Sequence, residues 1–114
     1  MEDIRKRLEQ LEYYVSLLVE SDIMQNLPFL NWVIKNNRTK KEIEHIFLVC
    51  EEIDALYKKQ KAEGFLHFHP LLQIFQEKTK PYIDDIEEFT FMMVREKLFA
   101  DLMKEFLKIQ HDLN

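Results

Sequence analysis

Two histidines one residue apart, His67 and His69, lie in the segment EGFLHFHPLL, residues 63–72, beside the only glycine of the chain. In an extended segment, side chains two residues apart point to the same side, which suits a shared zinc ion. A closed zinc site needs four ligands and a catalytic one three, and the nearby sequence offers no third ligand. We therefore interpret the segment as a structural corner between two helices, with a metal site as the alternative. His69, just before Pro70, is expected to cap the second helix.

Pairs of acids three residues apart form a second candidate site. Glu9 and Glu12 lie in the first segment, and Glu51 and Asp54 lie in a later one. Together they loosely resemble the carboxylate sets with which all-helical nucleotide pyrophosphohydrolases hold magnesium, an ion that prefers oxygen ligands. Acids at this spacing are also typical of a solvated helix face. A metal-dependent hydrolase that uses these carboxylates or the histidine pair is therefore the alternative interpretation, and we assign no catalytic residue and no cofactor.

Two other residue types with possible chemistry have simpler explanations. Glu42 and His45 have the spacing of a di-iron bundle motif, but such bundles need a second copy and two more glutamates. Cys50, the only cysteine, lies on the apolar side of a predicted helix and reads as a small core residue. A single cysteine cannot form an intramolecular disulfide, which fits a reducing compartment.

Composition excludes several classes of function. The 16 basic and 21 acidic residues give a net charge of −5, which argues against binding to nucleic-acid phosphates. One glycine is too few for a phosphate-binding loop, a dinucleotide-binding turn or a hydrolase nucleophile elbow. The chain shows neither a signal peptide nor an apolar run of the ~18 residues that a membrane span needs. We expect a cytoplasmic protein with no nucleic-acid or membrane partner.

The first segment predicts an amphipathic helix. Its apolar residues recur at intervals of four, three, four and three, which places them on one stripe: Ile4, Leu8, Leu11, Val15 and Leu18. This rhythm is also that of a coiled-coil seam, but Asp22 and Gln25 take the next two positions and end it. We expect the stripe to pack within a globular bundle.

Residues that typically begin or end helices predict the boundaries of the middle helices. Pro28 lies near the start of a short helix that ends at Asn36 and Asn37. Thr39 and Glu42 have the spacing of a capping box, and Gly64 stands where a left-handed residue ends a helix. A long helix is predicted between them, with this buried face: Ile43, Ile46, Phe47, Cys50, Ile53 and Tyr57.

The last third predicts three more helices. One begins at Pro70, with Leu71, Leu72, Ile74 and Phe75 pointing inward. Another follows a capping box at residues 84–87 and carries EFTFMMV, whose apolar residues cover every side and so require enclosure by this chain or a partner. The final helix repeats the four-three rhythm at these positions: Phe99, Leu102, Phe106, Ile109 and Leu113.

The order of these segments resembles a known family. RLEQLEYYVSLLV, PFLNWVI, KKEIEHIFLVCEEID, QKAEGFLHFHPLLQIF and LFADLMKEFLKI, which together run from about Arg7 to Ile109, are similar to the YhaI-like family of small uncharacterised proteins from Bacillus-type bacteria. The resemblance implies an all-helical fold and no assigned activity. It also implies that histidine is not required at His67 or His69, and that aspartate can replace His69, as suits a helix cap.

These observations predict one all-α domain over residues 1–114, a compact array of five or six helices. The surplus of large apolar residues in the first and last thirds predicts a homo-oligomer. The alternative is a monomer with one fully enclosed central helix, and an unidentified protein partner also remains open. The expected role is an interaction or regulatory module that acts through self-association. The residues assigned to the oligomer interface are Leu8, Leu11, Tyr14, Val15, Leu18, Phe89, Phe91, Met92 and Met93.

Overall fold

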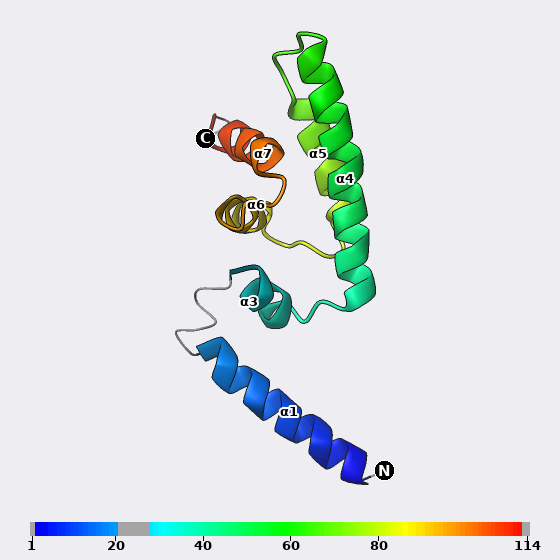
Figure 1. Cartoon of the computed structure of the whole chain (residues 1–114), viewed down its shortest axis with the longest axis vertical. Helices are drawn as coiled ribbons and strands as arrows, with labels where there is room; N and C mark the ends of the chain where they lie inside the picture. The colour runs from blue at the N-terminus through cyan, green and yellow to red at the C-terminus, as the bar shows by residue number, and fades with distance from the viewer. Residues whose placement is uncertain (1, 21–27, 113–114) are drawn as a thin grey trace. The chain divides into compact units, whose positions relative to one another are not determined.

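A computed structural model describes residues 2–20 and 28–112 of the chain (Figure 1). Six helices are found in these ranges, and none of these residues is in a strand, so the predicted all-α fold is confirmed. The helices are α1 (Glu2–Glu20), α3 (Pro28–Lys35), α4 (Lys40–Ala62), α5 (His69–Thr79), α6 (Ile86–Arg95) and α7 (Ala100–Asp112). The predicted positions Asp22, Gln25 and Leu113 lie outside the described residues.

The chain divides into two compact units, residues 1–37 and 38–114. The first unit contains α1 and α3, and the second contains α4 to α7. That the whole chain behaves as one domain remains an expectation from its length.

In the first unit, α3 begins and ends at the predicted residues. Pro28 is its first residue, a position where the missing N–H leaves no hydrogen bond unmade. At the other end, the Asn36 side chain donates from Nδ2 to the carbonyl of Trp32 at 2.8 Å. Asn37 then takes a left-handed φ of 54°, which asparagine tolerates better than most residues. The asparagine pair therefore ends α3.

The boundaries of α4, the longest helix, confirm two predictions. The N–H of Glu42 donates to Thr39 Oγ1 at 3.2 Å, and the N–H of Thr39 donates to Glu42 Oε1 at 2.7 Å, which completes the capping box. At the other end, the N–H of Phe65 donates to the carbonyl of Gln60 at 2.9 Å, and Gly64 has a φ of 93°. This hydrogen bond and the left-handed glycine after the last turn are features of a Schellman motif.

The core of the second unit is centred on Phe75 of α5. Its ring lies 6.0 Å from that of Phe89 on α6 and 5.4 Å from that of Phe106 on α7, and all three are fully buried. α6 and α7 are also joined by a hydrogen bond from Gln110 Nε2 to Thr90 Oγ1 at 3.3 Å. α4 packs on α5 and adds these buried residues to the core: Ile46, Val49, Cys50, Ile53 and Tyr57.

Two predicted caps are corrected by the structure. His69 is the first residue of α5 and does not cap it: Phe68 holds the cap position, with no side-chain hydrogen bond. The Phe68 ring packs edge-on against Tyr57 at 4.8 Å, and burying it fixes where the chain enters the helix. α6 is capped one residue later than predicted, because Asp85 accepts from the N–H of Glu88 at 3.0 Å.

The apolar α6 is enclosed largely by its own chain. Phe89, Met92 and Met93 are buried in the second unit, and Thr90 is buried beside them, with its hydroxyl donating to the carbonyl of Ile86 at 2.8 Å. Phe91 points outward and is 56% exposed. The chain's own residues therefore cover α6 except at Phe91, and cover by a partner at Phe91 remains a prediction.

Candidate interaction surface

The apolar stripe of α1 is exposed in the structure. Ile4, Leu8 and Leu11 expose 61%, 54% and 57% of their surface, and Val15 is half-buried. The intervals of four, three and four residues place these side chains on one face, which we call the α1 seam. Within the first unit, α3 does not bury these residues. That the stripe packs within a bundle remains a prediction. The side chain of Leu18 lies outside the described residues.

Charged and aromatic residues border the α1 seam. Arg5, Arg7 and Glu12 are adjacent to its apolar residues in sequence, and Tyr14 follows at 51% exposure. The ring of Tyr14 lies 6.1 Å from that of Tyr13, and the helix there also carries a hydrogen bond from Ser16 Oγ to the Tyr13 carbonyl at 2.7 Å. Tyrosine combines an apolar body with a polar tip and is enriched at protein interfaces. The surface thus has an apolar centre and a polar border, the usual anatomy of an interface.

The residues of α6 that were assigned to the oligomer interface divide into two groups. Phe89, Met92 and Met93 are buried in the core of the second unit and are unavailable to a partner, so their assignment is corrected. Phe91 alone of these four is exposed. The interface prediction therefore keeps Phe91 and the residues of α1.

Sequence reasoning missed other exposed apolar side chains of the second unit. Leu48 lines a shallow groove on α4 with Ile43 and Phe47, and Leu66, just after the helix, is 82% exposed. The signal was the run IFLVC at residues 46–50, which is apolar on more than one side of a helix. Scattered exposed apolar residues are common on protein surfaces, whereas the α1 seam is a continuous row.

A protein-family model matches this chain over nearly its whole length. The model of a family described as protein of unknown function, DUF1878, matches residues 1–111. The chain belongs to the DUF1878 family. The match spans α1 to α6 and all but the last residue of α7, so the exposed helix α1 is part of what the family shares. Because this DUF1878 description assigns no activity, function must be argued from the geometry.

Among the described residues, the histidine pair of this DUF1878 protein has no further metal ligands beside it. The rings of His67 and His69 are 6.3 Å apart, and both residues are exposed. Within residues 2–20 and 28–112, no three His, Cys, Asp or Glu side chains are grouped so that they would hold a metal ion. The geometry therefore favours the interpretation of this segment as a corner.

The paired carboxylates are on helices of different units. Glu9 and Glu12 are exposed on α1, and Glu51 is exposed on α4. Asp54 is half-buried and forms an ion pair with Lys58, its Oδ2 lying 2.9 Å from the ammonium nitrogen. The hydrogen bond that the Lys58 ammonium donates to the Asp54 carboxylate raises the pKa of Lys58. Among the described residues these acids form no common ligand set, so nothing there favours the hydrolase alternative.

Glu42 and His45 have structural roles. Glu42 completes the capping box and forms an ion pair with Arg38 at 3.4 Å. The hydrogen bond from the backbone N–H of Thr39 lowers the pKa of the Glu42 carboxyl. His45 Nε2 lies 3.3 Å from the carbonyl oxygen of Lys78, and its ring meets that of Tyr82 edge-on at 5.3 Å. These contacts account for both residues without an iron site.

Cys50 is a core residue of α4. It is fully buried, and burial raises the pKa of its thiol to about 12, with Asp54 and Glu51 adding to the shift. A nucleophilic cysteine needs the opposite shift, because the thiolate is the reactive form. The expectation of an unreactive thiol therefore has a physical basis.

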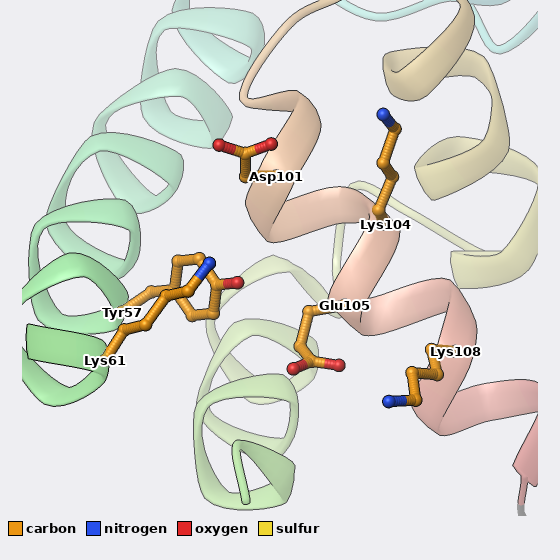
Figure 2. Close-up of a pocket in the computed structure, with 6 residues that line it drawn as sticks. All are labelled: Tyr57, Lys61, Asp101, Lys104, Glu105 and Lys108. Carbon is orange, nitrogen blue, oxygen red and sulfur yellow. The ribbon is translucent and has the colours of Figure 1, made fainter. Parts of the chain in front are cut away.

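A shallow groove lies between α4 and α7 (Figure 2). Tyr57 and Lys61 line it from α4, with the Lys61 ammonium nitrogen 5.6 Å from the centre of the Tyr57 ring. The remaining lining residues come from α7: Asp101, Lys104, Glu105 and Lys108. Three lysines face two acids here, so the groove has little net charge with which to select an anion.

Among the described residues, no helix combines the length and the apolar character needed to cross a bilayer.

Proposed function

We propose that this DUF1878 protein is an interaction or regulatory module that acts by self-association, with α1 as its principal contact surface. The observation that carries the proposal is the exposure of the α1 seam. Water in contact with a continuous apolar row is unfavourable, and a contiguous exposed patch of this kind usually marks an interaction site.

The second unit supports the proposal by contrast. α7 has the same four-three rhythm as α1, yet Leu102, Phe106 and Ile109 are all buried in the second unit. The apolar residues of α7 therefore lie in the core of the second unit, whereas Leu8 and Leu11 of α1 are exposed. A partner is the simplest means of covering them.

Size-exclusion chromatography with light scattering tests the proposal on the full chain. We expect a molar mass that is a multiple of 14.0 kDa at micromolar concentration. Leu11→Glu should reduce it to that of the monomer, because a buried unpaired carboxylate opposes association. Leu66→Glu is the matched control: Leu66 is more exposed than Leu11 but lies outside the α1 seam, so this variant should remain associated. A monomeric unmodified chain would refute the proposal.

Two finer assignments accompany this role. We place the protein in the cytoplasm, an assignment supported by its single cysteine, a buried thiol. Within the DUF1878 family we group it with the YhaI-like proteins, on the segments from RLEQLEYYVSLLV to LFADLMKEFLKI.

A further inference from the structure

The apolar residues of the α1 seam have the same spacing in either chain direction: four, three and four residues. In heptad notation, Ile4 and Leu11 are d residues, and Leu8 and Val15 are a residues. If a second α1 runs in the opposite direction, Ile4 faces Val15 of the second copy and Leu8 faces Leu11. The two mirror contacts follow from the symmetry, so every apolar residue of the seam has a partner.

We propose that α1 pairs with α1 of a second copy in an antiparallel, two-fold symmetric coiled coil. This inference rests on the proposed self-association and specifies its geometry. A two-fold axis makes the same patch serve both chains, and the seam meets that condition in this register. Leucine faces leucine near the axis, and the β-branched Ile4 and Val15 face each other towards the ends.

The residues that border the seam complement each other in the same register. Antiparallel pairing brings e residues beside e residues, which places Arg5 next to Glu12 of the second copy, twice by symmetry. It brings g residues beside g residues, which places Arg7 next to Tyr14. The first contact is an ion pair, and the second is a cation–π contact. Within residues 2–20 and 28–112, Arg5, Arg7 and Glu12 form no other ion pair.

A parallel pair is less complementary. It would pair Arg7 with Glu12 of the second copy, but Arg5 and Tyr14 would lose their charged and aromatic counterparts. It would also bring the RKR segment, residues 5–7, of both chains to one end of the coil. Reversing one helix separates these cations and opposes the two helix dipoles. Charge complementarity therefore favours the antiparallel register.

Cysteine cross-linking tests the register. The double variant Ile4→Cys plus Val15→Cys should form covalent dimers on mild oxidation, because residues 4 and 15 face each other. Ile4→Cys alone should not, since two copies of residue 4 would be offset by 11 residues, or about 16 Å along the axis, and a disulfide needs Cα atoms within about 7 Å. The unmodified chain is the control for Cys50, which is buried and should not cross-link.

Charge exchange provides an independent test. Glu12→Arg should raise the dissociation constant of the dimer at least roughly tenfold, because it turns two attractions into two repulsions. Adding Arg5→Glu should restore association, whereas adding Arg7→Glu should not. A parallel coil would give the opposite result for the two double variants.

The outcomes separate the two proposals. The antiparallel coil is supported if the double cysteine variant forms cross-links and Ile4→Cys by itself does not, and if Arg5→Glu restores association to Glu12→Arg. If Ile4→Cys by itself forms cross-links and Arg7→Glu restores association to Glu12→Arg, the antiparallel coil is overturned, whereas the proposed self-association is not. An associated protein that forms no cross-link with either variant places the interface elsewhere and also overturns the coil. A monomeric unmodified chain overturns both proposals, and α1 is then covered by its own chain or by a different protein.

Discussion

Phe89 and Phe91 offer the sharpest test of the core, because they are two residues apart on α6 and differ completely in burial. Phe89 is fully buried with its ring 6.0 Å from Phe75, whereas Phe91 is 56% exposed. We consider the same substitution, Phe→Leu, at each position. It removes an aromatic ring of similar chemistry in the same helix and therefore isolates the effect of burial.

The expected magnitudes follow from packing. Phe89→Leu leaves a small cavity and removes an aromatic contact worth about 0.5–1.5 kcal/mol, so we expect a loss of roughly 1.5–3 kcal/mol in the free energy of unfolding. Phe91→Leu should change it by less than about 0.5 kcal/mol, as surface substitutions usually do. Against a total of roughly 5–15 kcal/mol, the first loss is readily measured.

Urea unfolding followed by circular dichroism at 222 nm measures both variants. Protein concentration should be varied, because self-association would make the apparent stability depend on it. A double-mutant cycle of Phe75→Leu with Phe89→Leu should give a coupling of at least about 0.5 kcal/mol, as expected for residues in contact. Equal losses at Phe89 and Phe91, or no coupling, would refute the packing described for α6.

Three further predictions concern single residues. Cys50 should resist Ellman's reagent until urea unfolds the protein, and stability should fall as pH rises from about 9 towards 12, because the unfolded thiol, with a pKa near 8.5, loses a proton that the folded thiol keeps up to about 12. Rapid labelling of the native protein would contradict its burial. Thr39→Ala should cost about 1 kcal/mol in urea unfolding by removing the capping box, and Thr39→Ser should cost little; equal losses would argue against the cap. Lys97→Gly should stabilise the fold by about 0.5–1 kcal/mol, since Lys97 has a φ of 58°, whereas Gly64→Ala should destabilise it by a similar amount at a φ of 93°. The same sign for both changes in melting temperature would show that backbone conformation does not decide them.

Local chemistry accounts for what the sequence predicted well. Thr39 with Glu42 and the isolated Gly64 act through hydrogen bonds and backbone angles within a few residues, and the structure has both features where they were predicted. The caps at Asp85 and Phe68 were misplaced by one residue. Adjacent aspartates both satisfy the cap pattern, and burial of Phe68 against Tyr57 is a tertiary contact that no local pattern contains.

Whether an apolar face is covered was beyond the sequence. α1 and α7 share one spacing, but Leu11 is exposed and Phe106 is fully buried. Periodicity identifies the residues that share a face, and only the other helices decide what lies against it. For the same reason Phe89 and Phe91 were assigned to one interface, although α6 turns the first inward and the second outward.

Sedimentation equilibrium of the unmodified chain over a range of micromolar concentrations tests the central claim most directly. Self-association through α1 predicts an average mass above the 14.0 kDa of one chain, falling towards that value on dilution. A mass of 14.0 kDa at every concentration would contradict it.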